Sequence, residues 1–156
     1  MNAFDAAFER VIGHEGGYTA GKGDPGGETK YGISARAHPG EDIAGMTLDR
    51  AKAIYLRDYW GPAGCDAVPE GVKTDLFDMA VNAGVVAAVK CLQRAVDEDV
   101  DGVLGPRTLQ AVQSMPAARL LARFNGHRLE HMAMLPHWPA FGRGWARRIA
   151  MNLKGA

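Results

Sequence analysis

The sequence predicts a mainly α protein of the α+β class, in which a helical domain carries one small β-hairpin near the N-terminus. Apolar residues recur at helical spacing through most of the 156-residue chain. Only the segment from Gly16 to Ser34 is rich in Gly, Pro and Thr, which is typical of an irregular hairpin. The 47% hydrophobic and 23% charged residues are the proportions of an ordinary globular protein.

The N-terminal helix is predicted over residues 3–14, where four apolar side chains share one face. Two glycines, Gly16 and Gly17, follow and end the helix. Within the glycine-rich segment, β-forming pieces around residues 18–19 and 30–33 predict the hairpin.

Six further helices are predicted from the same periodicity, with turn-forming residues between them. Thr47 is a good N-cap for the first of the six, and Gly84 ends the second. The six cover about residues 47–59, 69–83, 85–96, 106–114, 116–134 and 140–153.

No run of about 18 apolar residues is present, so the sequence predicts no stable membrane insertion. Asp5 and Glu9 stand where a secretory signal would carry a basic patch and then an apolar stretch. We therefore expect a protein that is made in the cytoplasm without a signal peptide.

The sequence predicts no metal and no cofactor. The two cysteines lie beside small or apolar residues and are expected to be free thiols in the core. His127 and His131 are four residues apart, but the segment HRLEH lacks the Glu of an H-E-x-x-H motif. Residues 97–102 begin like a calcium-binding loop, but Thr108 stands where the bidentate Glu would be.

The net charge of zero hides an asymmetry along the chain. Residues 1–102 hold 10 Lys or Arg against 17 Asp or Glu, whereas residues 103–156 hold 8 against 1. The last predicted helix and its approach contain Arg143, Arg147, Arg148 and Lys154. Such a basic face suits an anionic partner, and the alternative is an ordinary solvated surface. No groove-reading motif accompanies it, so we expect no nucleic-acid partner.

One constellation in HEGGYTAGKGDPGGETKYGIS, residues 14–34, predicts acid–base chemistry. Glu15 lies at the end of the first predicted helix, where the helix dipole and partial burial should raise the pKa of a carboxyl group. A raised pKa allows a general acid to hold its proton near neutral pH. Asp24, on a Gly/Pro-rich turn, should stay ionised, and the Thr29 hydroxyl could orient a water molecule. Two carboxylates in different environments are the minimum for glycoside hydrolysis.

Each of these residues also has an ordinary structural explanation. A Glu at a helix end is usually only solvated, and an Asp before Pro-Gly usually forms a turn. The joint arrangement of Glu15, Asp24 and Thr29 is much rarer than any one of them, and it favours the catalytic interpretation.

The order of Glu15, Asp24 and Thr29 resembles the Glu–Asp–Thr arrangement of phage lysozymes, with four residues rather than five between Asp24 and Thr29. More specifically, AFERVIGHEGGY and DPGGETKYGIS resemble glycoside hydrolase family 108, the N-acetylmuramidase endolysins with an E-G-G-Y motif. LDRAKAIYLRDYW and LFDMAVNAGVVAAVKCLQRAV extend the resemblance. VDGVLGPRTLQAV looks like the peptidoglycan-binding helical domain that is appended in that family.

The resemblance implies a lysozyme-like fold in which Glu15 is the catalytic acid and Asp24 and Thr29 are its catalytic partners. Four further residues are candidates for substrate binding. Tyr18 and Tyr31 either stack on sugar rings or pack against the hairpin. Asp78 and Asn82, at i and i+4 on one helix, either line the saccharide cleft or face the solvent.

The resemblance also implies an activity. The chain would be a peptidoglycan hydrolase, an antimicrobial bacteriophage endolysin that cleaves the β-1,4 bond between N-acetylmuramic acid and N-acetylglucosamine. Its partner would be bacterial peptidoglycan, reached in the periplasm after release from the host cytoplasm, and we expect a monomer. Residues 1–90 would form the catalytic region and residues 91–156 the peptidoglycan-binding-like region, packed as one globule. A lytic transglycosylase acting on the same bond and a non-catalytic cell-wall-binding protein are the alternatives.

Overall fold

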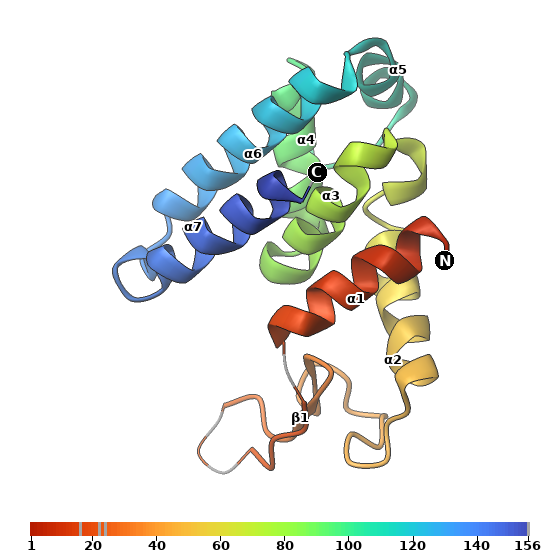
Figure 1. Ribbon diagram of the computed structural model, residues 1–156, viewed down its shortest axis with the longest axis vertical. Helices are drawn as coiled ribbons and strands as arrows, with labels where there is room; N and C mark the ends of the chain where they lie inside the picture. Colours follow the sequence, from red (N-terminus) through yellow and green to blue (C-terminus); the bar gives the residue numbers. More distant parts are fainter. Residues whose placement is uncertain (16, 22, 24, 156) are drawn as a thin grey trace. The chain divides into compact units, whose positions relative to one another are not determined.

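The computed structural model confirms the predicted mainly α fold (Figure 1). It describes residues 1–15, 17–21, 23 and 25–155, apart from the side chains of residues 12–15. The chain forms two compact units, Met1–Asp58 and Tyr59–Ala156. The division predicted at residue 90 concerns which segment cleaves and which binds the wall, and it stays a prediction.

The first unit is built on two helices and a short hairpin. Its elements are α1 (Ala3–Glu15), β1 (Thr29–Lys30), β2 (Ile33–Ser34) and α2 (Leu48–Tyr55). The buried rings of Phe8 in α1 and Tyr55 in α2 meet edge to face, with 5.4 Å between their centroids. Lys52 of α2 donates to Asp5 of α1 at 2.6 Å, so an ion pair joins the same two helices beside the aromatic contact.

The start and the extent of the helical segment that contains α2 are as predicted, but the type of its last turn is not. The side chain of Thr47 caps the helix by accepting a hydrogen bond from the Arg50 amide at 3.2 Å. The helix was expected to continue to about residue 59, but its α-helical part ends at Tyr55 and one π-helical turn follows, η1 (Leu56–Trp60). A π turn closes with i→i+5 hydrogen bonds, so a periodicity of 3.6 residues does not report it.

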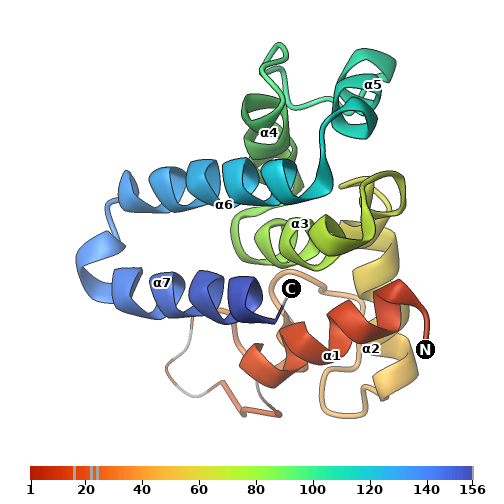
Figure 2. The same cartoon turned by 45° about the horizontal axis from the view of Figure 1, so that its top comes forward.

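In the second unit, three helices pack against one central helix (Figure 2). Its elements are η2 (Cys65–Ala67), α3 (Glu70–Ala83), α4 (Val85–Ala95), α5 (Pro106–Ser114), α6 (Ala117–Ala133) and α7 (Trp138–Lys154). Helix α3 contacts α4, α6 and α7, and its residues 75–80 are all buried. Because consecutive residues are buried there, this stretch has no polar face, and its two acids, Asp75 and Asp78, are buried together with the apolar residues.

A buried carboxylate in α3 binds both C-terminal helices. Asp78 accepts hydrogen bonds from Arg128 Nη2 at 2.6 Å, Arg148 Nε at 2.7 Å and Asn152 Nδ2 at 2.9 Å. Asp78 is only 2% exposed and Arg128 is fully buried. Burial opposes ionisation of Asp78, but the guanidinium groups of Arg128 and Arg148 outweigh it and hold the pKa of the carboxyl below its usual range.

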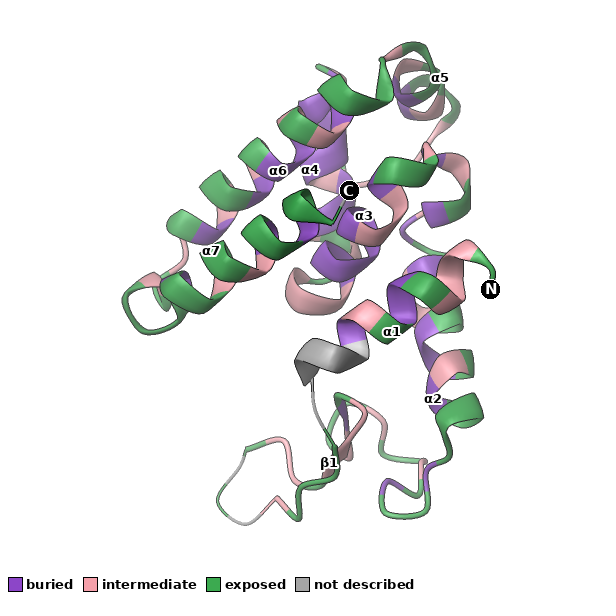
Figure 3. Cartoon of the chain, in the orientation of Figure 1, coloured by how far each residue is buried: buried purple, intermediate pink, exposed green. Residues whose placement is uncertain are grey.

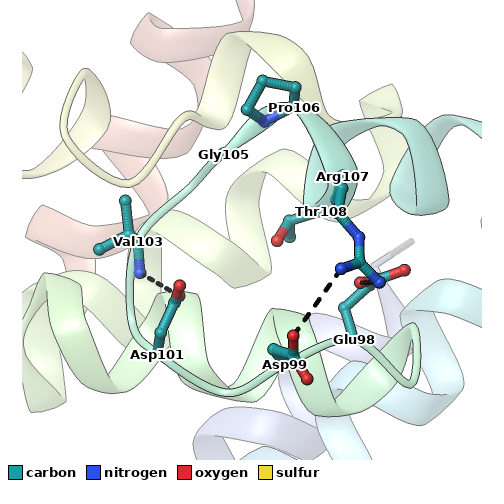
Figure 4. Close-up of a pocket in the computed structure, with 8 residues that line it drawn as sticks. All are labelled: Glu98, Asp99, Asp101, Val103, Gly105, Pro106, Arg107 and Thr108. Carbon is teal, nitrogen blue, oxygen red and sulfur yellow. Dashed lines mark hydrogen bonds and ion pairs between the residues drawn. The ribbon is translucent and has the colours of Figure 1, made fainter.

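Figure 4 shows the loop between α4 and α5, whose path is set by a side chain that is not drawn there, that of Gln93 in α4. The amide nitrogen of the buried Gln93 donates to Asp101 Oδ1 at 2.7 Å, the Val103 carbonyl at 3.0 Å and Thr108 Oγ1 at 3.3 Å. Its amide oxygen accepts from the Gly102 backbone at 2.9 Å. Because these contacts span residues 101–108, they set the path of the loop up to the start of α5.

The structure confirms that Cys65 and Cys91 are free and buried. Burial raises the pKa of the Cys65 thiol to about 12, so this thiol is protonated at neutral pH. None of the helices in the described part of the chain has the length and apolarity that crossing a bilayer requires.

Helix α7 separates its side chains only in part, because Trp145 is half-buried and Phe141 is exposed. Ile149 is buried, whereas Arg143, Arg147 and Lys154 are exposed. Arg148 was expected on the same basic face, but its side chain is only 13% exposed because it pairs with the buried Asp78. The exposed basic face therefore has one charge fewer than the sequence suggested.

Replacing Asp78 with Asn should lower the free energy of unfolding by about 3–5 kcal/mol, because two guanidinium groups then lose their counter-charge. Urea denaturation measures the change. Asp99→Asn is the matched control, since the Asp99 side chain is 89% exposed, and it should change stability by less than about 0.5 kcal/mol. Equal losses in the two variants would contradict the structural role of Asp78.

Stability should also depend on pH through this carboxyl. The pKa of Asp78 is lower in the folded chain than in the unfolded chain, so its ionisation stabilises the fold fully above about pH 4. That contribution is lost as the pH falls from there through the folded pKa. The stability advantage of the wild type over Asp78→Asn, measured by denaturation at a series of pH values, should therefore shrink below about pH 4. A pH-independent difference would show that Asp78 is not ionised in the fold.

Candidate active site

Glu15, the predicted catalytic acid, is the last residue of α1, so the residue does stand at a helix end as predicted. Its side chain lies outside the described residues. Asp24, the predicted second carboxylate, also lies outside them. Thr29 is therefore the one member of the predicted catalytic set whose side chain the structure describes.

Thr29 is held in the middle of the hairpin. Its backbone exchanges two hydrogen bonds with Thr19, at 2.7 and 3.0 Å, and in the β1–β2 register it is the partner of Ser34. Its hydroxyl is half-buried and donates to the Gly27 carbonyl at 3.4 Å, a long hydrogen bond within the same loop. The backbone of Thr29 is thus fixed on both sides, and its hydroxyl is only weakly engaged.

A tight turn joins the two strands. Tyr31 and Gly32 have φ values of 51° and 75°, and positive φ at both central residues is the geometry of a two-residue hairpin turn. Positive φ is unfavourable for a tyrosine, and the Tyr31 carbonyl accepts a hydrogen bond from the Tyr55 hydroxyl at 2.7 Å. A bond from α2 therefore stabilises the turn that positions Tyr31, whose side chain is half-buried.

Tyr18 lies next to a carboxylate that the sequence interpretation did not consider. Its ring is 47% exposed, and its hydroxyl donates to Glu28 Oε1 at 3.3 Å. Desolvation and then the Glu28 charge raise the pKa of Tyr18, so the phenol stays protonated and can donate. Glu28 is exposed and directly precedes Thr29. Glu28 lies in the same glycine-rich segment as Asp24 and Thr29, and that position is the sequence signal by which it could have been chosen as a candidate site residue.

The two candidates on α3 differ in their surroundings. Both carboxylate oxygens of Asp78 accept hydrogen bonds from Arg or Asn side chains within the second unit, so the solvent-facing alternative is wrong for Asp78. Asn82 is half-buried in the last turn of α3. A saccharide contact remains a prediction for both residues, and the burial of Asp78 does not favour it.

The described part of the site is a hairpin that presents hydroxyls, a carboxylate and an aromatic ring, namely those of Thr29, Glu28 and Tyr18. Such groups can bind and orient a polar substrate such as a sugar. Among the described residues, no group of three or more His, Cys, Asp or Glu is placed to hold a metal ion.

Comparison with known proteins gives a family and a structural relative. Residues 8–84 match the family model described as Glycosyl hydrolase 108. This window contains every candidate site residue, from Glu15 to Asn82, and ends just after α3. Twelve chains of solved structures match. One, described as the structure of Brucella abortus SagA, is 35% identical with a TM-score of 0.85, and the match covers 96% of this chain and 90% of that chain. No curated protein matches.

Replacing Gly21 with Ala should disturb the hairpin, because Gly21 has a φ of +68° and an added Cβ would lie 2.2 Å from the Gly27 carbonyl carbon. We expect a loss of at least about 1 kcal/mol of stability and faster hydrogen exchange at the amides of Thr19 and Thr29. Gly40→Ala is the control, since nothing lies within 4 Å of its added Cβ. Unchanged exchange in Gly21→Ala would show that the close approach of Gly21 and Gly27 is not needed for the hairpin.

Proposed function

Because the chain belongs to the glycosyl hydrolase 108 family, we propose that it hydrolyses peptidoglycan with Glu15 as the general acid. The bond we propose is the β-1,4 linkage between N-acetylmuramic acid and N-acetylglucosamine. Family membership makes the chain a glycoside hydrolase. The observation that carries the assignment of the acid is that Glu15 is the last residue of α1, inside the family window and directly before the glycine-rich segment.

The end of a helix is a suitable place for an acid. The last carbonyl groups of a helix have no partners within it, and their dipoles create a negative potential. Such a potential favours the neutral form of a carboxyl group, which is the form that can donate a proton. An acid located there can protonate the glycosidic oxygen at a pH where a free carboxyl group would be ionised.

In the proposed reaction, Glu15 gives its proton to the bridging oxygen as the bond from that oxygen to C1 of the muramic acid breaks. The bonding electrons leave with the oxygen, which becomes the 4-hydroxyl of the glucosamine, and positive charge develops at C1. A second carboxylate then either activates a water molecule or bonds to C1 before water replaces it. In both routes the water supplies the new hydroxyl on C1, and a carboxylate accepts its proton.

Two residues are candidates for the second carboxylate. Asp24 is supported by the resemblance to the Glu–Asp–Thr order. Glu28 is supported by its exposure, by its hydrogen bond from Tyr18 and by its position next to Thr29. The exposed ring of Tyr18 offers a face on which a sugar could stack.

We further propose the cellular role that the resemblance implies, a bacteriophage endolysin that acts on the wall of its host after release and is therefore antimicrobial. This role predicts that cytoplasmic expression leaves bacteria intact until their inner membrane is permeabilised, and that they lyse promptly afterwards. Lysis without permeabilisation, or its absence after permeabilisation, would contradict the role.

A lytic transglycosylase is the second candidate, since that reaction also begins with one acid but needs no second carboxylate. In it the 6-hydroxyl of the muramic acid attacks C1, and the product is an anhydro sugar that is lighter by one water. Mass spectrometry of fragments released from purified peptidoglycan separates the two reactions. We expect fragments that end in muramic acid with a free hydroxyl on C1, and not in the lighter anhydro sugar.

Glu15→Gln should lower the rate of peptidoglycan cleavage by at least about 10²-fold, because the amide cannot donate the required proton. Clearing of purified wall suspensions measures the rate, and circular dichroism checks the fold. Glu9→Gln is the matched control, because Glu9 is an exposed acid on the same helix. A Glu15→Gln enzyme as fast as the Glu9→Gln enzyme would refute the assignment. Lack of activity in the wild type would support a non-catalytic wall-binding protein.

Comparison of Asp24→Asn with Glu28→Gln identifies the second carboxylate. We expect Asp24→Asn to cost nearly as much as Glu15→Gln, and Glu28→Gln and Thr29→Ala to cost less. A larger loss in Glu28→Gln would transfer the role to Glu28. Near-normal rates in both acid variants, together with anhydro products, would favour the transglycosylase.

A further inference from the structure

Much of the connection between α6 and α7 is exposed (Figure 3), and some of its exposed residues are apolar. Met134, which follows the last residue of α6, is 82% exposed, and Phe141 in the first turn of α7 is 54% exposed. The two helices pack against each other, so both residues lie at the same end of this helical hairpin. Between them the chain runs through Leu135 and Pro136. We call residues 134–141 the hairpin end.

An aromatic cluster lies behind this end. The ring centroid of Trp145 lies 6.1 Å from that of Trp138 and 5.9 Å from that of Phe141. The ring of Trp138 lies across Gly142, where an added Cβ would be only 2.5 Å from it. The cluster therefore presents a preformed apolar surface that loses little conformational entropy on binding.

Positive charge follows the apolar residues along α7. No Asp or Glu occurs after Glu130, so the last 26 residues hold cations without a single acid. Arg143 and Arg147 are exposed and one helical turn apart, about 6 Å along the axis. Arg148 does not belong to this set because it pairs with Asp78.

A cavity of about 420 Å³ adjoins the same end of the hairpin. Its lining residues are Arg94, His127, Glu130, His131, Met134 and Leu135. Glu130 lies 3.6 Å from His127, so one acid is present among three basic side chains. The cavity thus places basic groups directly beside the apolar side chains of Met134 and Leu135.

We propose that the hairpin end docks reversibly on an anionic lipid bilayer. The basic groups match the negative headgroups, and the apolar residues match the boundary of the acyl region. Phe141 and Arg147 are six residues apart, about 9 Å along the helix. With this end of the hairpin directed at the bilayer, Phe141 meets the acyl boundary while Arg147 lies further back, at the level of the headgroups.

A bilayer fits this surface better than a glycan does. Sugar-binding surfaces combine aromatic rings with hydrogen-bonding groups that read the hydroxyls. The large exposed side chains of the hairpin end, Met134 and Phe141, are apolar, and three of the four polar side chains in the adjoining cavity are basic, which suits an anionic headgroup more than a sugar hydroxyl. This docking does not depend on the proposed catalysis, and it would hold the chain at a membrane surface.

Sedimentation with vesicles tests the proposal. We expect the wild type to bind vesicles of phosphatidylethanolamine and phosphatidylglycerol and to bind pure phosphatidylcholine at least about fivefold more weakly. Met134→Ser with Phe141→Ser should remove most of the binding. Val86→Ser with Val103→Ser is the matched control, because these valines are 58% and 65% exposed on the same unit. Equal binding by the two double variants would overturn the proposal.

The charges are tested separately. Arg143→Gln with Arg147→Gln should weaken binding to the anionic vesicles by about fivefold for each charge, with a larger effect at low salt. Arg119→Gln is the control, an exposed cation in the first turn of α6. If the arginine variants lose binding to lipid-free purified wall but keep the wild-type affinity for vesicles, the surface binds wall polymer and the lipid proposal fails.

Tryptophan fluorescence gives a test that needs no variant. Trp60 is only 1% exposed, whereas Trp138 and Trp145 stand at the hairpin end or directly behind it. Anionic vesicles whose acyl chains carry bromine should quench part of the emission. Absence of quenching at lipid concentrations that sediment the protein would show that the hairpin end stays out of the bilayer.

Discussion

The carboxylate of Asp78 and the guanidinium groups of Arg128 and Arg148 can be buried only together, because each charge alone would be too costly to desolvate. This constraint brings α6 and α7 onto α3 in one arrangement. It also decides which cations of α7 face the solvent. With Arg148 held inward, Arg143 and Arg147 remain outside, and the aromatic residues of α7 are left to pack along the helix itself.

Most helices could be predicted because their apolar spacing records which side is buried. The boundaries at Gly84 and Pro106 follow from backbone chemistry that acts within a few residues. The burial of Asp78 could not be predicted in this way. Its partners lie 50, 70 and 74 residues further along the chain, and no local pattern connects an acid to such distant cations. The π turn was missed because it breaks the period on which the prediction relied.

The parts of the candidate site that could be predicted are those for which adjacent residues in the sequence carry a recognisable signal. A Glu before two glycines indicates a helix end, and the structure places Glu15 at one. Glu28 has no comparable local signal, because a Glu between a Gly and a Thr marks no particular turn, whereas an Asp before Pro-Gly does. The positive φ of Tyr31 has no signature in the residue itself, and only the adjacent Gly32 and the bond from Tyr55 explain it.

The contacts of Gln93 have a consequence for the acidic loop that follows α4. Three oxygen atoms, from Asp101, Val103 and Thr108, converge on the amide nitrogen of one side chain. In loops of similar composition that converging position belongs to a calcium ion. Here the amide nitrogen of Gln93 occupies that position, so a side chain of the protein itself holds the loop in shape. The shape of the loop should therefore be the same with and without a calcium chelator.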